Sequence, residues 1–225
     1  FPSRDGTEIE GWTFMPPGYD SKLRYPTILR IHGGPNGMYG VAFNFEAQFL
    51  AANGYVVLIT NPRGSSGYGE DFSMALWQKW GIPDFDDVMA GVDHAIDEGY
   101  SDPDRLGLGG WSYGGILTNY VITKTDRFGG AITGASMALL IANFGHDHHT
   151  LGNEREWGLP WESREMWEKL SPFNAVDKVV TPTLIMGGEQ DWNVPIQNSE
   201  QLYQALRRRG VPTQLVVYPG QPHGL

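Results

Sequence analysis

The alternation of short apolar runs with segments of helical periodicity, from one end of the chain to the other, most constrains the fold. Several of these runs are β-branched and continuous, as is typical of strands that are buried on both faces. The runs that predict strands are 8–14, 27–31, 55–60, 105–109, 130–133, 183–186 and 214–218. Strands that alternate with helices predict an α/β fold, with a mostly parallel central sheet and helices on both of its faces.

The helical segments are recognised by their apolar stripes and by their end signals. Residues 84–98 carry one apolar stripe, and Asp84, Asp86 and Asp87 supply negative charge to the first turn, where the helix dipole favours it. Residues 195–209 begin at a proline and end in three arginines before a glycine. Residues 143–172 lack this rhythm, so we expect an insertion or cap segment there.

Composition constrains the chemistry and the binding partners of this chain, but it does not fix the compartment. The 225 residues suit a single domain, 1–225, and the absence of cysteine excludes disulfides, thiolate metal sites and a cysteine nucleophile. A net charge of −10 argues against nucleic acid or an anionic membrane as a partner. No apolar run is long enough to span a membrane. We expect a soluble protein whose compartment stays open, with the cytoplasm slightly favoured over a periplasmic or secreted location.

A glycine-rich motif follows the predicted strand 105–109 and precedes the helical segment 116–125. It reads Gly110-Trp111-Ser112-Tyr113-Gly114-Gly115. A Gly-x-Ser-x-Gly motif between a strand and a helix is typical of a nucleophilic serine that is held in a strained turn. The alternative is a glycine-rich turn with an incidental serine. The preceding strand and the additional glycine favour Ser112 as a catalytic nucleophile.

A nucleophilic serine requires a general base, and the position of His223 favours it over the other histidines. The candidates are His32, His94, His146, His148, His149 and His223. His223 follows the last predicted strand, and catalytic groups of open α/β sheets gather where the strands end. His94 lies inside a predicted helix. The cluster 146–149 lacks metal-ligand spacing, so we interpret it as a solvated loop and predict no metal site.

The same reasoning selects the acid that orients the base. Asp191 follows the predicted strand 183–186, on the edge of the sheet that we expect for His223, whereas Asp177 precedes that strand. The chain order of serine, acid and histidine is that of α/β-hydrolases. Glu189 is the local competitor because it lies nearer the end of the strand. We therefore predict Asp191 as the acid and keep Glu189 as the alternative.

The oxyanion hole of such a site combines two backbone amides. One belongs to the residue after the nucleophile, Tyr113, and the other to the loop after an early strand. Residues 31–35, Ile-His-Gly-Gly-Pro, follow the strand 27–31, and Gly34 is the preferred donor. The alternative interpretation of this segment is a tight turn without a catalytic role.

The sequence resembles the catalytic domain of the prolyl oligopeptidase family of serine peptidases over nearly its whole length. The Asn-Pro-Arg-Gly-Ser-Ser-Gly-Tyr-Gly segment, 61–69, is the most specific motif of the resemblance, and in the family its arginine, here Arg63, is structural. Further matching segments are 4–7, 32–35, 80–81 with Asp84 and Asp87, 110–115, 171–172, 181–183, and Asp191 with 194–195. The resemblance implies the α/β-hydrolase fold and the cleavage of short peptides without a cofactor.

Two positions bear on the branch of the family. His32 stands where the prolyl oligopeptidase and dipeptidyl peptidase IV branches have tyrosine, and so resembles the acylaminoacyl-peptidase branch. Asn193 instead resembles an asparagine of dipeptidyl peptidase IV that binds a substrate carbonyl. Tyr113, Val194 and the segment 136–140 resemble the lining of the specificity pocket, although core packing is at least as good an interpretation for Met137 and Leu139. The type of exopeptidase therefore stays open.

The resemblance also carries expectations about the rest of the protein. Family members usually have a β-propeller ahead of the catalytic domain and a final helix after the catalytic histidine, and this chain contains neither. We expect an N-terminal β-propeller in the full-length protein, and homo-oligomerisation stays open. A carboxylesterase with the same triad is the alternative function, and a noncatalytic binding module of the same fold is a third.

Overall fold

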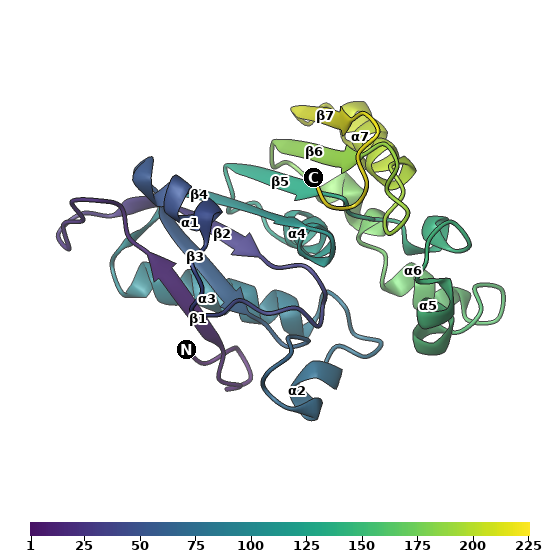
Figure 1. The fold of residues 1–225 in the computed structure, drawn as a ribbon, viewed down its shortest axis with the longest axis horizontal. Helices are drawn as coiled ribbons and strands as arrows, with labels where there is room; N and C mark the ends of the chain where they lie inside the picture. The colour runs from purple at the N-terminus through teal and green to yellow at the C-terminus, as the bar shows by residue number, and fades with distance from the viewer.

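The computed structural model describes residues 1–225, and its centre is a seven-stranded sheet in the order β1-β3-β2-β4-β5-β6-β7 (Figure 1). The strands are β1 Glu10–Phe14, β2 Tyr25–Ile31, β3 Val56–Asn61, β4 Ser101–Trp111, β5 Gly130–Gly134, β6 Thr183–Gly188 and β7 Thr213–Tyr218. Only β1 is antiparallel to its neighbour, β3. The predicted mostly parallel sheet is confirmed, and every predicted strand is present within four residues of its expected ends.

The helices include the predicted ones and several more. They are α1 Phe45–Ala52, α2 Glu70–Met74, α3 Pro83–Asp97, α4 Tyr113–Lys124, α5 Thr150–Trp157, α6 Arg164–Lys169 and α7 Gln197–Arg209, with 3-10 turns at Leu140–Asn143 and Pro172–Lys178. The sequence did not indicate α1, because Phe45 and Phe49 are exposed while the small Ala47 and Ala51 are buried. No apolar stripe marks such a helix.

Helices cover both faces of the sheet, as predicted, but they cover them unequally. On one face, Leu58 of β3 and Ile185 of β6 belong to a single large core with residues of α3, α4 and α7. On the other face, Val57 and Ile59 pack with Ala47 of α1. An open groove of about 830 Å³ lies along the amino ends of β2, β4, β5, β6 and β7.

The irregular segment 143–172 contains the short helices α5 and α6, which lie at one side of the molecule, far from β1 and the N-terminus (Figure 1). Its buried indoles form a chain of edge-to-face contacts. Trp157 lies between Trp167 and Trp80, with ring centroids 4.9 and 5.2 Å away. Helical periodicity is weak in the segment 143–172, and aromatic packing joins this segment to the main core.

No helix of the structure has the length and apolar composition needed to cross a membrane.

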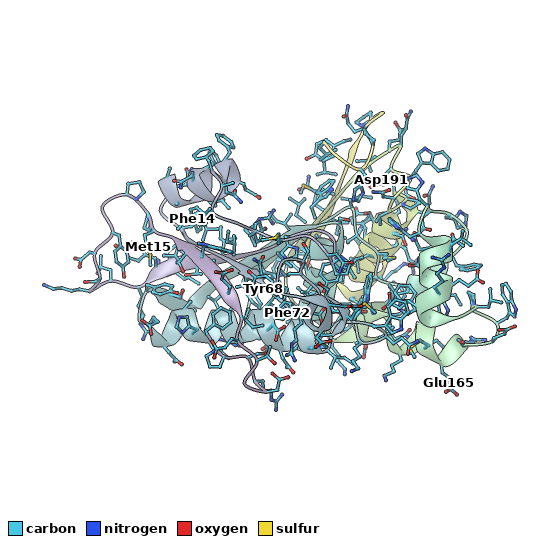
Figure 2. The ribbon with its side chains drawn as sticks, turned by 60° about the horizontal axis from the view of Figure 1, so that its bottom comes forward. Phe14, Met15, Tyr68, Phe72, Glu165 and Asp191 are labelled. Carbon is cyan, nitrogen blue, oxygen red and sulfur yellow. The ribbon has the colours of Figure 1, made fainter.

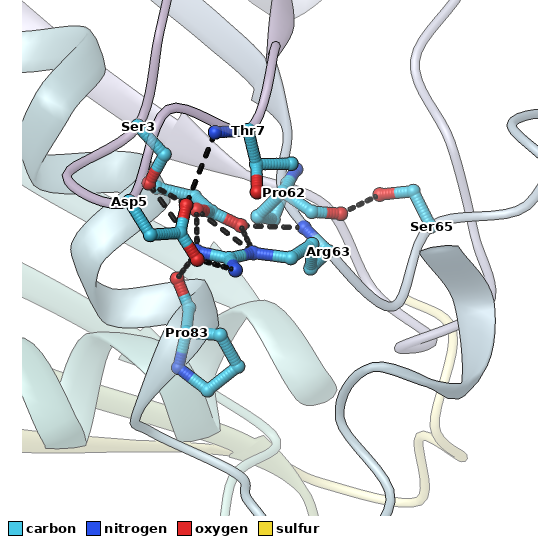
Figure 3. A network of polar contacts seen from close by, with 8 residues as sticks. Ser3, Asp5, Thr7, Pro62, Arg63, Ser65 and Pro83 are labelled. Atoms are coloured by element: carbon cyan, nitrogen blue, oxygen red, sulfur yellow. Dashed lines mark hydrogen bonds and ion pairs between the residues drawn. The ribbon is translucent and has the colours of Figure 1, made fainter. Parts of the chain in front are cut away.

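The N-terminal segment is held to the domain by Arg63, as Figure 3 shows. The Arg63 guanidinium donates to the buried carboxylate of Asp87 on α3 and to Asp5 near the N-terminus. Its backbone amide also donates to Asp87, at 2.8 Å. This network joins the N-terminal segment, the loop after β3 and α3.

Candidate active site

Ser112 occupies a sharp turn between the end of β4 and the start of α4. Its φ is 59° and its ψ is −125°, a conformation that non-glycine residues rarely adopt and that recurs at functional sites. The Ser112 amide donates to the carbonyl of Gly134, 2.9 Å away on β5. The strained turn that the motif predicted is therefore present.

The glycines of the motif are required by close backbone packing. A Cβ on Gly110 would lie 2.3 Å from the carbonyl carbon of Gly114, and one on Gly114 would lie 2.2 Å from the carbonyl oxygen of Ile31. Both distances are far below any contact of a real Cβ. The turn thus packs closely against β2, the strand that precedes the predicted oxyanion loop.

Asp191 and His223 lie together at the carboxyl edge of the sheet. The Asp191 Oδ2 atom is 2.7 Å from the His223 Nδ1 atom, and the Asp191 side chain is fully buried. Its second oxygen, Oδ1, accepts the amides of Asn193 and Val194 at 2.8 and 2.9 Å. The loop after β6 therefore orients its own carboxylate toward the imidazole. Figure 2 shows Asp191 beside the C-terminal strands.

Glu189, the competing acid, contacts the backbone of the histidine loop. Its Oε2 atom accepts the Gly220 amide at 2.8 Å. This bond closes the turn after β7 that carries His223 toward Asp191. Glu189 supports the loop in this structure, while Asp191 is the carboxylate that bonds the ring.

Trp111 connects the histidine loop to the serine turn, a contact that the sequence analysis did not anticipate. The Trp111 indole NH donates to the His223 carbonyl oxygen at 2.8 Å, and the two ring centroids are 6.5 Å apart. Because Trp111 directly precedes Ser112, this bond holds the His223 backbone beside the serine turn. The signal in the sequence was the tryptophan inside the Gly-x-Ser-x-Gly motif.

The predicted oxyanion loop approaches Ser112 through its first glycine. A Cβ on Gly33 would lie 3.5 Å from the Ser112 Cβ atom, and Gly34 has φ 140°, which favours glycine. His32 is buried, and its Nδ1 and Nε2 atoms lie 2.8 Å from the Gly33 oxygen and 2.9 Å from the Ser65 hydroxyl. Burial lowers the pKa of His32. These contacts anchor the loop through the His32 ring.

The predicted substrate-binding positions lie in the loop after β6. Val194 is buried and Asn193 is half-buried, and both use their backbone amides to bind Asp191. Met137 belongs to the main hydrophobic core. Of the predicted positions, Asn193 and Leu139 are only half-buried.

Asp84 is a second residue whose role the sequence analysis did not identify. It was interpreted only as a helix-terminus charge, yet it is fully buried and its Oδ2 atom accepts the Tyr113 hydroxyl at 2.5 Å. A charge at a helix terminus needs no burial. The packing of α3 against α4 buries Asp84 and brings it to the Tyr113 hydroxyl, so its role is not only that of a helix-terminus charge. The available signal was the match of Asp84 to a family motif.

The other histidines lie outside this constellation. His94 is exposed and stacks on the ring of Phe1, with centroids 5.5 Å apart. His146, His148 and His149 are exposed in the loop before α5. Ser112, Asp191 and His223 follow the carboxyl ends of β4, β6 and β7. A hydrogen bond joins Asp191 to His223, whereas the Ser112 hydroxyl makes none in this structure. A serine, a histidine and a carboxylate are the groups that nucleophilic acyl transfer requires.

Comparison with known proteins identifies the family. The family model described as "Prolyl oligopeptidase family" matches residues 41–225. An uncharacterized peptidase of Bacillus subtilis, YuxL, is 42% identical over 100% of this chain and 35% of its own length. The acylamino-acid-releasing enzyme of Arabidopsis thaliana is 33% identical over 89% of this chain and 28% of its own length. The chain thus spans about a third of the length of these curated relatives.

The structural comparison gives the same family and confirms the α/β-hydrolase fold. The Pyrococcus horikoshii acylaminoacyl peptidase superposes with a TM-score of 0.93 at 32% identity, over 100% of this chain and 37% of that one. The motif, the fold and the similarity over the whole chain agree, and the chain belongs to the prolyl oligopeptidase family of serine peptidases.

Proposed function

We propose that this chain is the catalytic domain of a serine peptidase that hydrolyses short peptides through an acyl-enzyme on Ser112. The observation that carries the proposal is the bond between the buried Asp191 carboxylate and His223, at the sheet edge where the strained Ser112 turn begins. Membership of the prolyl oligopeptidase family supports the reaction class.

In the proposed reaction, the Ser112 hydroxyl attacks the carbonyl carbon of the scissile bond while His223 accepts its proton. The imidazolium is stabilised by Asp191 and then protonates the leaving amine as the C–N bond breaks. Water, deprotonated by His223, hydrolyses the ester on Ser112 and regenerates the hydroxyl. These groups complete the reaction without a metal or an organic cofactor.

The amides of Tyr113 and Gly34 would bind the oxyanion of each tetrahedral intermediate. The Tyr113 amide suits this role because the first amides of a helix have no intrahelical acceptor and lie at the positive end of the dipole. Gly34 precedes a proline in a loop that packs on Ser112 through Gly33. Asn193 and Val194 are proposed to contact the substrate from the opposite loop.

The substrate class is proposed to be short peptides with a blocked or free N-terminus, as for acylaminoacyl or dipeptidyl peptidases. The names of the Arabidopsis and Pyrococcus relatives support the acylaminoacyl type. We also propose that the full-length protein carries an N-terminal β-propeller that limits the size of the substrate, in keeping with the greater length of the relatives.

The decisive experiment compares the full-length protein with Ser112→Ala. We expect a fluorophosphonate to label the first and not the second, and amide hydrolysis to fall by a factor on the order of 10⁶. A panel of acyl-alanyl anilides, dipeptidyl anilides and nitrophenyl esters reports the substrate class. Turnover of the esters alone would establish the carboxylesterase alternative, and unlabelled but folded protein would refute catalysis by Ser112.

A further inference from the structure

The side chain of Tyr113 is buried, although the residue directly follows the proposed nucleophile. Tyr113 is 1% exposed, and its hydroxyl donates to the Asp84 Oδ2 atom at 2.5 Å. The Trp80 ring meets the phenol edge-on, with centroids 5.4 Å apart and planes at 88°. The ring and the hydroxyl of Tyr113 are therefore both held by residues outside α4.

Asp84 is an unusual group to find in the core. It is the second residue of α3 and is fully buried; its Oδ2 atom also accepts the Gly81 amide at 3.1 Å, whereas Oδ1 has no partner. Burial raises the pKa of Asp84 to about 6, and burial beside Asp84 raises the pKa of Tyr113 well above its ordinary value. An incompletely bonded buried carboxyl is costly, and the Tyr113 phenol is its side-chain partner.

The consequence for catalysis lies in the backbone of Tyr113. In the proposed reaction the Tyr113 amide donates to the oxyanion, and the side chain of the same residue is anchored by Asp84. Ser112 is held in a sparsely populated conformation, so neighbouring restraints must maintain the turn. The bond from Ser112 to Gly134 restrains one side of the turn, and the bond from Tyr113 to Asp84 restrains the other.

We infer that Asp84 is a positioning residue, which acts through the Tyr113 phenol to hold the Tyr113 amide in line with the oxyanion. This inference rests on the proposed function of the site. Asp84 does not contact the substrate and affects the oxyanion only by positioning Tyr113. Replacing Asp84 should therefore lower kcat and leave KM nearly unchanged.

Tyr120 provides a matched control on the same helix. It is 4% exposed, and its hydroxyl donates to the Leu170 carbonyl oxygen. Tyr120→Phe and Tyr113→Phe each remove one buried hydroxyl hydrogen bond from α4. The acceptor is a backbone carbonyl for Tyr120 and a carboxyl group for Tyr113, so unfolding curves of both variants accompany the kinetics. Only Tyr113 adjoins the proposed nucleophile.

The experiment measures kcat and KM of full-length Tyr113→Phe, Asp84→Asn and Tyr120→Phe, each normalised to the sites that a fluorophosphonate titrates. We expect Tyr113→Phe to lower kcat about 10-fold and Asp84→Asn by a smaller factor, with KM within about twofold. Tyr120→Phe should keep the kcat of the parent. A peptide aldehyde, which forms a tetrahedral adduct, should lose affinity for Tyr113→Phe by the same factor as kcat.

Parent kcat in Tyr113→Phe, or equal losses in Tyr113→Phe and Tyr120→Phe, would overturn the inference. If Tyr113→Phe does not fold, the isosteric Asp84→Asn decides by the same comparison with Tyr120→Phe. Failure of the proposed function would look different, because the parent protein itself would then neither cleave amides nor react with the fluorophosphonate.

Discussion

Both oxygens of the Asp191 carboxylate accept hydrogen bonds. One oxygen bonds the His223 ring, and the other accepts two amides of its own loop. Glu189 is only two residues away, but its longer side chain turns to the Gly220 amide. Position after a strand identified both acids as candidates, whereas only the loop geometry distinguishes their partners.

Replacing each acid by its amide tests this division of roles. In the proposed mechanism, Asp191→Asn leaves His223 in the wrong tautomer to accept the serine proton, so we expect kcat to fall by about 10⁴-fold. Glu189→Gln retains an acceptor for the Gly220 amide, and kcat should stay within about twofold of the parent. The measurement is kcat for anilide hydrolysis by the full-length protein at a fixed pH; losses of equal size in the two variants would contradict the assignment of Asp191.

At the scale of elements, the junction of β4 and α4 shows packing overriding helix propensity. The sequence predicts the helix over 116–125, after the two glycines that follow Tyr113, and glycine has a low helix propensity. The helix nevertheless begins at Tyr113. Glycine is required in its first turn because a Cβ on Gly114 would lie 2.2 Å from the Ile31 carbonyl oxygen, and one on Gly115 would lie 2.6 Å from the Gly134 carbonyl oxygen. These glycines allow α4 to approach the ends of β2 and β5.

Two alanine substitutions on β4 separate this close packing from a general effect of losing glycine. Gly110→Ala places a methyl group against the Gly114 backbone, so we expect the free energy of unfolding to fall by roughly 1–3 kcal/mol or more, with a loss of hydrolysis. The control is Gly107→Ala, whose added Cβ would find its nearest neighbours at 3.8 Å, and its change should stay within about 1 kcal/mol.

Urea unfolding followed by circular dichroism measures both differences. If Gly107→Ala proves as destabilising as Gly110→Ala, the close approach of the Gly114 backbone is not the reason for glycine at position 110.

At the scale of the whole molecule, Arg63 connects segments that are far apart in the sequence (Figure 3). Its partners are Asp87, 24 residues later on α3, and Asp5, 58 residues earlier. Hydrogen bonds from Thr7 and Arg63 lower the pKa of Asp5 to about 2. The Asp87 side chain is fully buried, whereas that of Asp5 is 55% exposed. We therefore expect the ion pair with Asp87 to affect the free energy of unfolding more than the pair with Asp5.

Removing the guanidinium should therefore be severe. Arg63→Met leaves the buried Asp87 carboxylate without its cation, and we expect the free energy of unfolding to fall by roughly 3–5 kcal/mol. Arg164→Met removes an exposed ion pair with Glu168 and should leave the stability nearly unchanged. Chemical unfolding of the two variants tests the contrast, and a small effect of Arg63→Met would show that the N-terminal segment is held by other contacts.

The sequence by itself determined the succession of strands along the chain, the helices α3, α4 and α7, and the candidate nucleophile, acid and base, because β-branched runs, turn residues and strand ends are local signals. It also determined the family resemblance, which the comparisons confirm. Only the tertiary structure decided that Glu189 bonds a backbone amide, that Trp111 holds the His223 loop, and that Asp84 anchors Tyr113. The physical reason is that each of these contacts joins residues 29 to 112 positions apart, and such pairs meet only through the order of the sheet and the packing of helices on it.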